Sequence, residues 1–461
     1  MRTRSLLAFV VTAALAACGP HTVPAAGPSP AGDSTALVAL PDTSANADSI
    51  ARVVLRGCRW GSYNARRVCV ERSLDQVLDR SGIAKAMAVL DTIAARNDDL
   101  RREAHGMAHG LGIAAYKSPE TVAQIFAACP NTQISGCYHG VIQGYFLDVA
   151  RRTGTVTAED LARVCTPHRS NTELYMQCVH GMGHGVMAVT SHRLPDALKL
   201  CDLLRGYTEQ AGCWSGAFME NIVGATHPEH TAEAHAAVSG GRVHGDSAHA
   251  AMDHAAMDHG AMGHEGMDHG AMVMDHGAMQ HGDTRAPWKA LDPKDPLYPC
   301  DAVDGKYGPA CYLIQTAAIL GQNGGDVSET AHACSTAPAE LVRTCYASLG
   351  RDLTAYAGRD PRRTAELCAR AGDAELDCLA GAAIALYEVD MKPDDAFGLC
   401  RAVDGTARKT ACYEASARRI HMTFPQPERM GAVCGAAEAG YVAACRAAAS
   451  LPPEPAASGA K

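Results

Sequence analysis

The sequence predicts an all-α fold, a solenoid of about ten helix-turn-helix repeats of about 34 residues each, interrupted by a disordered insertion. Cysteines recur at a nearly constant step. One complete repeat is legible in residues 360–390, where two helical stretches flank a Gly-Asp turn. Aromatic residues make up only 5% of the chain and alanine is abundant, which suits closely packed helices.

The N-terminus predicts export. A basic start and a short apolar run end in Leu15-Ala16-Ala17-Cys18, the pattern of a secretory signal in residues 1–17. This ending resembles a bacterial lipobox, which implies cleavage before Cys18 and lipidation of that cysteine; an ordinary signal peptide with a chance cysteine is the alternative. Residues 18–48 are rich in Ala, Pro, Ser, Thr and Gly and predict a flexible tether. We therefore expect a lipid-anchored protein of the bacterial cell envelope, facing the periplasm or the exterior, with membrane contact only through the anchor.

The other cysteines predict disulfides. The chain has 19 cysteines, and setting Cys18 aside leaves an even number in close pairs. Exported proteins occupy compartments where disulfides persist, so the pairs indicate disulfides rather than thiolate metal sites. Nearest-neighbour pairing is the simplest connectivity: Cys58 with Cys69, Cys129 with Cys137, Cys165 with Cys178, Cys201 with Cys213, Cys300 with Cys311, Cys334 with Cys345, Cys368 with Cys378, Cys400 with Cys412 and Cys434 with Cys445.

The repeat unit explains the spacing of these pairs. In residues 360–390, a helix through PRRTAELCARA is followed by a turn at Gly372-Asp373 and a second helix through LDCLAGAAIALYEVD. Pro393 then opens the next helix, where its missing N–H costs nothing. A disulfide between the two cysteines would clamp each hairpin. The repeats fill residues 49–225 and 298–450, and residues 451–461 are predicted to be a disordered tail.

This period and cysteine placement resemble the tetratricopeptide and Sel1-like helical repeats, especially secreted, disulfide-stapled versions. The resemblance covers most of the folded chain and implies a solenoid. The tetratricopeptide consensus residues do not occur in order, so the resemblance implies no functional residues.

A seven-residue sequence motif recurs at the same position in three successive repeats. It reads AHGMAHG at 104–110, YHGVIQG at 138–144 and VHGMGHG at 179–185. One repeat lacks cysteines, and Glu103 stands where its second cysteine would be. His105, His139 and His180 then align with one another, and His109 and His184 align with Gln143.

The aligned histidines predict a metal site. Histidines four residues apart lie on one face of a helix, so the pair His105 and His109, the pair His180 and His184, and His139 would present five imidazoles from three neighbouring helices. Imidazole suits copper, zinc, iron and nickel. Glu103 and Glu220 are candidate carboxylate neighbours. No glutamate stands between the paired histidines as in H-E-x-x-H, which excludes a zinc peptidase of that type. The glycines that follow the histidines predict close helix approach; they are Gly106 and Gly110, Gly140 and Gly144, and Gly181 and Gly185. Hydrogen bonding between repeats is the alternative role for the histidines.

The predicted disordered linker, residues 226–297, carries a second metal signal. Met-x-His recurs nearly every five residues, a period that fits neither a helix face nor a strand. Thioethers select Cu(I), whereas imidazole also binds Cu(II). The segment resembles the Met/His-rich stretches of periplasmic copper-resistance proteins; a low-complexity spacer is the alternative. The candidate ligands are Met252, His254, Met257, His259, Met262, His264, Met267, His269, Met272, His276, Met279 and His281.

These signals predict a copper-binding protein for tolerance or delivery. A metal-dependent oxidoreductase that uses copper or iron at the same histidines is one alternative. The other is a repeat scaffold that binds a periplasmic protein on its concave face. The net charge of −9, with no basic patch, argues against nucleic acid as a partner.

Overall fold

The computed structural model describes residues 38–42, 44–231, 234–235 and 288–453. The predicted signal peptide, Cys18, most of the tether, the Met/His-rich ligands and most of the tail lie outside these residues. The described residues form twenty α-helices and short 3₁₀ turns, with no β-strand. The all-α prediction is confirmed for this part of the chain.

The N-terminal half places its helices in pairs. It begins with α1 (Ala47–Gly57), α2 (Tyr63–Ser81), α3 (Ile83–Arg96) and α4 (Asp98–Ala115). Short and long helices then alternate: α5 (Val122–Ala128), α6 (Gly136–Thr153), α7 (Ala158–Cys165), α8 (Thr172–Val189), α9 (Leu194–Cys201) and α10 (Tyr207–Thr226).

The C-terminal half repeats this alternation after two short helices. They are α12 (Gly308–Tyr312) and α13 (Thr316–Gln322). The remaining helices are α14 (Val327–Ser335), α15 (Val342–Tyr356), α16 (Pro361–Ala369), α17 (Glu375–Asp390), α18 (Pro393–Ala402), α19 (Thr406–Thr423), α20 (Pro427–Gly435) and α21 (Val442–Ala448).

The local sequence fixes where the helices begin. Asn97 and Asn171 cap α4 and α8 in the same way, each side chain accepting a hydrogen bond from a backbone N–H three residues later. Pro361, Pro393 and Pro427 lie in the first turns of α16, α18 and α20, where a helix needs no donor.

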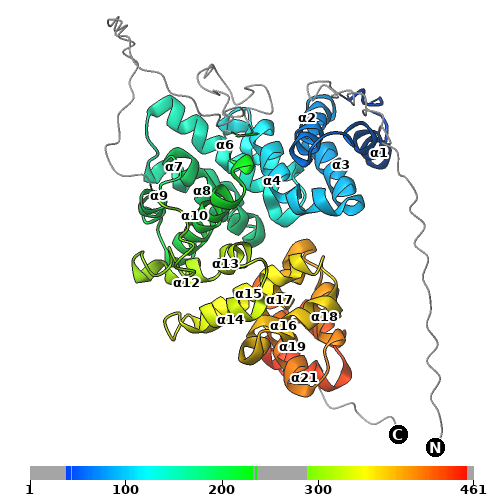
Figure 1. The fold of residues 1–461 in the computed structure, drawn as a ribbon, viewed down its shortest axis with the longest axis vertical. Helices are drawn as coiled ribbons and strands as arrows, with labels where there is room; N and C mark the ends of the chain where they lie inside the picture. Colours follow the sequence, from blue (N-terminus) through cyan, green and yellow to red (C-terminus); the bar gives the residue numbers. More distant parts are fainter. Residues whose placement is uncertain (1–37, 43, 232–233, 236–287, 454–461) are drawn as a thin grey trace, which may run out of the picture.

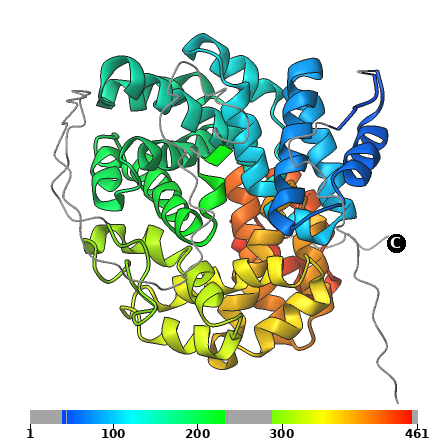
Figure 2. The same cartoon turned by 45° about the horizontal axis from the view of Figure 1, so that its top comes forward.

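Each long helix packs against the next long helix. In the N-terminal half the row is α4, α6, α8, α10, and in the C-terminal half it is α15, α17, α19, followed by the short α21 (Figure 1). Helices α12 and α13 join the rows by contacting both α10 and α15. The row curves, and in Figure 2 part of the C-terminal half overlaps the N-terminal half. Helix α17 thereby contacts residues 133–135, which lead into α6.

Glycines let neighbouring long helices approach closely, but only some of them are the predicted ones. A Cβ on Gly140 of α6 would lie 2.0 Å from the carbonyl oxygen of His109 and 3.0 Å from the Cα of Gly112 on α4. Gly216 of α10 meets the carbonyl of His180 in the same way. Gly106 and Gly110, by contrast, face histidine rings rather than a helix backbone. The pattern could not show this because those rings come from a distant segment.

All nine predicted cysteine pairs lie at disulfide distance, with Cα atoms 5.4 to 5.8 Å apart and sequence separations of 8 to 13 residues. The nearest-neighbour connectivity is therefore the one that the structure contains. The bonds join Cys58 with Cys69, Cys129 with Cys137, Cys165 with Cys178, Cys201 with Cys213, Cys300 with Cys311, Cys334 with Cys345, Cys368 with Cys378, Cys400 with Cys412 and Cys434 with Cys445.

The disulfides clamp the hairpins as the repeat unit predicts. In α5–α6, for example, the bond from Cys129 to Cys137 joins the end of the short helix to the first turn of the long one. The hairpin α3–α4 is the one described hairpin without a disulfide, as the cysteine spacing predicts.

We expect that replacing Cys400 and Cys412 together by serine will destabilise the protein by about 3 kcal/mol, because a loop of this length is no longer closed in the unfolded chain. The midpoint of chemical unfolding measures this change. A reducing agent should shift the wild-type midpoint at least as far, and an unchanged midpoint in the double variant would contradict the prediction.

The prediction that residues 226–297 are disordered is wrong at both ends of this segment. Residues 228–230 form a 3₁₀ turn that packs back on α4. At the other end, Trp288 donates from Nε1 to Asn221 Oδ1 at 2.9 Å, and Asn221 donates to the carbonyl of Ala290 at 2.9 Å. Trp288, Leu291 and Leu297 belong to the hydrophobic core or pack against it, so residues 288–297 have apolar surface to bury. None of the described helices is long and apolar enough to cross a bilayer.

Candidate metal centre

Three adjacent long helices bring the five aligned histidines together. His105 and His109 lie on α4, His139 on α6, and His180 and His184 on α8. Helices α4 and α8 each contact α6, so the middle helix places its single histidine between the two pairs. The alignment of the repeats by their cysteines therefore predicted correctly that these five histidines lie close together.

The rings form two overlapping triads that share His139. In the first triad, the ring centroids of His105, His109 and His139 are 4.6, 5.3 and 5.9 Å apart. In the second, those of His139, His180 and His184 are 4.8, 5.0 and 5.1 Å apart. In both triads one nitrogen of each ring lies within 4.8 Å of one nitrogen of each other ring.

These separations match what an ion requires. A metal–nitrogen bond of about 2.0–2.1 Å places ring centroids roughly 3.2 Å from the ion, and hence roughly 5.3 Å apart in a tetrahedral site. Both triads lie near that value. Since His139 belongs to both, the triads can be filled together only if each of its nitrogens binds one ion.

Neighbouring groups orient three of the five rings. His105 Nδ1 lies 2.8 Å from the carbonyl oxygen of Gln133, and His184 Nδ1 lies 2.8 Å from Glu220 Oε2. His139 Nε2 lies 3.2 Å from Gln177 Oε1. Each contact fixes the ring and leaves its other nitrogen to face elsewhere, as outer partners do for histidine ligands of metals.

Several of the remaining nitrogens are buried without a protein partner. They are His109 Nε2, His139 Nδ1 and His184 Nε2. Gln143, which aligns with His109 and His184, is 1% exposed, and neither atom of its amide has a partner either. Buried polar groups are nearly always hydrogen-bonded, so such a concentration needs an explanation. A bound cation would satisfy the nitrogens at once.

Burial sets the protonation of these rings. It lowers the pKa of His105 to about 4, opposed by the hydrogen bond to Gln133. Burial, and then repulsion between neighbouring imidazoles, holds the pKa values of His109, His139 and His180 well below the usual range. These four rings are therefore neutral at pH 7, which is the form that binds metals.

This depression predicts how the metal-free protein responds to acid. Between pH 6.5, the ordinary histidine value, and about 4, the unfolded chain binds protons that His105 in the folded state does not. Stability should therefore be highest above pH 6.5 and fall as the pH drops through this window. Urea unfolding midpoints across pH 4–8, with EDTA present, measure the slope. His105→Gln should make it shallower by the share of one ring, whereas His332→Gln, at an exposed position on α14, should leave it unchanged.

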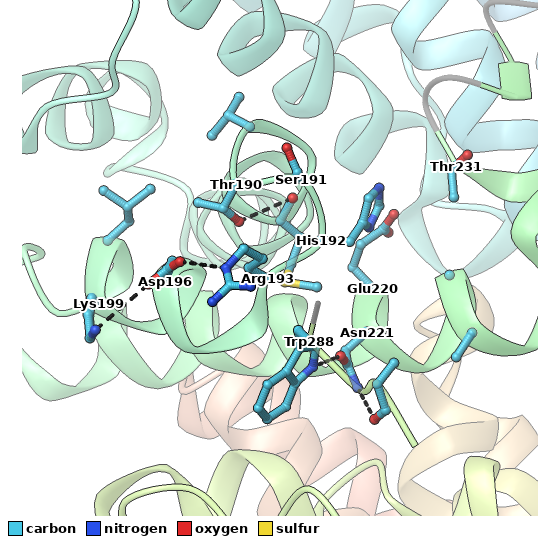
Figure 3. Close-up of a pocket in the computed structure, with 16 residues that line it drawn as sticks. Thr190, Ser191, His192, Arg193, Asp196, Lys199, Glu220, Asn221, Thr231 and Trp288 are labelled. Atoms are coloured by element: carbon cyan, nitrogen blue, oxygen red, sulfur yellow. Dashed lines mark hydrogen bonds and ion pairs between the residues drawn. The ribbon is translucent and has the colours of Figure 1, made fainter. Parts of the chain in front are cut away.

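A pocket with polar and apolar walls lies at one edge of the cluster. It has a volume of about 880 Å³ and is bounded by the ends of α8 and α10, by α9 and by Trp288. Figure 3 shows Glu220 beside His192 in its wall, with Arg193, Asp196 and Lys199 joined by ion pairs on the other side. Glu220 thus lines the pocket with the same carboxylate that holds His184. The pocket thus reaches the residue that contacts His184.

The two carboxylates named from the sequence have different places. Glu220 Oε2 contacts His184, and Glu220 forms a third potential ligand set with His109 and His184. Glu103 does not join the five histidines. It lies with His230 and His227, which the sequence did not indicate as ligands because both fall in the segment predicted to be disordered. The only sequence feature that could have indicated these two histidines is their position directly after the predicted repeats, which end at residue 225.

Comparison with protein-family models, curated proteins and solved structures found no match. The assignment of this centre therefore depends on its geometry and donor chemistry.

Proposed function

We propose that this protein binds a metal ion, most favourably copper, at the cluster of His105, His109, His139, His180 and His184. The observation that carries this proposal is the convergence of five imidazoles with three buried nitrogens that have no protein partner. A purely structural role would instead give each buried nitrogen a hydrogen bond.

The choice of copper depends on the Met/His-rich segment. Imidazole alone accepts copper, zinc, iron and nickel, but alternating thioethers and imidazoles suit copper in both of its oxidation states. Those residues lie outside the described part of the chain, so copper is an inference from sequence. We further propose that the chain is an exported lipoprotein and that its stapled hairpins form a solenoid related to tetratricopeptide or Sel1-like repeats. Such a protein would serve copper tolerance or delivery in the envelope.

Metal analysis of the full-length protein tests the proposal. Protein purified with copper supplied should retain copper by elemental analysis. A full-length variant with serine in place of every Met and His between residues 244 and 281 should retain the ions of the folded part and lose those of the segment. Protein that takes up no copper, zinc, iron or nickel in either form would refute metal binding.

The pocket beside Glu220 favours a second candidate function, an oxidoreductase. A cavity of this size at the edge of a metal centre can admit a small substrate. The experiment is to measure oxidase activity of the copper-loaded protein toward small reductants. Turnover that is lost in Glu220→Gln, with copper content preserved, would favour the enzyme; its absence across substrates would leave binding and delivery.

A further inference from the structure

A second group of metal-ligating side chains lies on another side of α4. Glu103, His227 and His230 each place one ligand atom within 4.8 Å of the others. Glu103 and His230 are buried, at 6% and 7% exposure, whereas His227 is exposed. The group therefore has a closed side made by α4 and an open side at His227.

Both oxygens of the Glu103 carboxylate have fixed partners. The hydroxyl of Tyr63 on α2 donates to Oε1 at 2.5 Å, and His230 Nε2 lies 2.5 Å from Oε2. Burial raises the pKa of Glu103, but the hydrogen bonds from His230 and Tyr63 outweigh it and lower that pKa to about 2. The carboxylate is therefore ionised and directed toward the two histidines.

Helix α4 makes room for this segment with glycine. A Cβ on Gly106 would lie 2.1 Å from His230 Nδ1, and one on Gly110 would lie 2.6 Å from the Nδ1 of His235. Glycine costs roughly 1 kcal/mol relative to alanine at each such helix position. Helix α4 therefore carries two such glycines on the side against which the rings of His230 and His235 pack.

The side of α4 against which His230 and His235 pack also carries buried polar atoms without a protein hydrogen bond. His230 Nδ1, His235 Nε2 and Glu71 Oε2 are buried without a protein hydrogen bond. Glu71 also pairs with Arg67 through its other oxygen at 2.5 Å. Beyond the ion pair between Glu103 and His230, the group includes His227, whose ligand atom lies within 4.8 Å of theirs.

We propose that Glu103, His227 and His230 form a second metal site, separate from the five-histidine cluster, for a divalent first-row cation such as zinc. Two imidazoles and one carboxylate are a common ligand set for such ions. Tyr63 is the outer partner that orients the carboxylate. Three protein ligands and an exposed His227 leave a coordination position open to solvent. This site does not depend on the function proposed for the cluster, since the two sets share no residue.

Zinc stoichiometry in matched variants tests this assignment. The background is the full-length chain with serine in place of Met and His between residues 244 and 281, and bound Zn²⁺ is measured by equilibrium dialysis. Glu103→Gln should lower the bound zinc by one ion per chain while keeping a hydrogen bond to His230. Glu159→Gln, an exposed glutamate paired with Arg163 on α7, is the matched control and should bind as the background does. His139→Gln should leave the ion at Glu103 in place, which separates failure here from failure of the cluster.

A second pair of variants covers the case in which Glu103→Gln does not fold. His230→Gln removes one ligand, and Gly106→Ala displaces the ring of His230 without changing any ligand. Both should weaken zinc binding at this site by about 10-fold to 100-fold or more. Folding is checked by circular dichroism. Unchanged stoichiometry and affinity in the folded variants would overturn the proposal and leave Glu103–His230 as an ion pair that tethers the segment after α10.

Discussion

Replacing His139 by glutamine is expected to reduce the metal affinity of the cluster by about 100-fold or more. Loss of an outer-shell partner alone typically costs 10-fold to 100-fold, and His139 belongs to both triads. Its ring lies within 5.9 Å, centroid to centroid, of those of His105, His109, His180 and His184. Glutamine roughly preserves the volume and the polar contact with Gln177, so the fold should survive.

Competition titrations with a chromophoric chelator measure this affinity. The protein used is the full-length variant with serine in place of every Met and His between residues 244 and 281. His105→Gln removes a ligand from one triad only and should have a smaller effect. His332→Gln, at an exposed position on α14, is the control. If His139→Gln binds as tightly as the control, the ion does not lie between the triads and the proposed centre is wrong.

The second large effect is expected from Gly140→Ala, which should destabilise the protein by about 3 kcal/mol. The new Cβ would lie 2.0 Å from the carbonyl oxygen of His109. Since that atom belongs to a helix backbone, α4 and α6 must move apart to relieve the overlap. The same movement separates His109 from His139, so metal affinity should fall together with stability.

Chemical unfolding of the metal-free protein measures the change in stability. Gly321→Ala is the matched control because a Cβ there meets nothing within 4 Å and the residue also lies in a helix, α13. That substitution should stabilise the protein by about 0.5 kcal/mol, because alanine restricts the unfolded chain. Equal unfolding midpoints for the two variants would show that α4 and α6 are not as close as described.

Most of the scaffold could be predicted because its signals are local and repeated. Cysteine spacing set the hairpins, and Pro393 marked the start of one helix. The convergence of the histidines followed from the same register, since one position in each repeat faces the same place. Glu220 could be named because it stands one residue after an aligned position.

The pairing of Glu103 with His230 could not be predicted. The two residues are 127 positions apart, and no period relates the segment after α10 to α4. The roles of Gly106 and Gly110 depended on that pairing and were misassigned with it. Composition also suggested disorder through residue 297, because a repetitive Met/His stretch outweighs a few bulky residues such as Trp288 in any window of sequence.

The hairpin α3–α4 carries two of the five imidazoles, yet it is the one described hairpin without a disulfide bond. An ion bridging His105 and His109 to His139 would fasten this hairpin to its disulfide-bonded neighbour, as a reversible equivalent of the missing bond. Removal of the ion would then loosen this part of the array before any other. Amide hydrogen exchange along α4 would thus report how much metal the protein carries, and a partner that senses that loosening could distinguish the full form from the empty one.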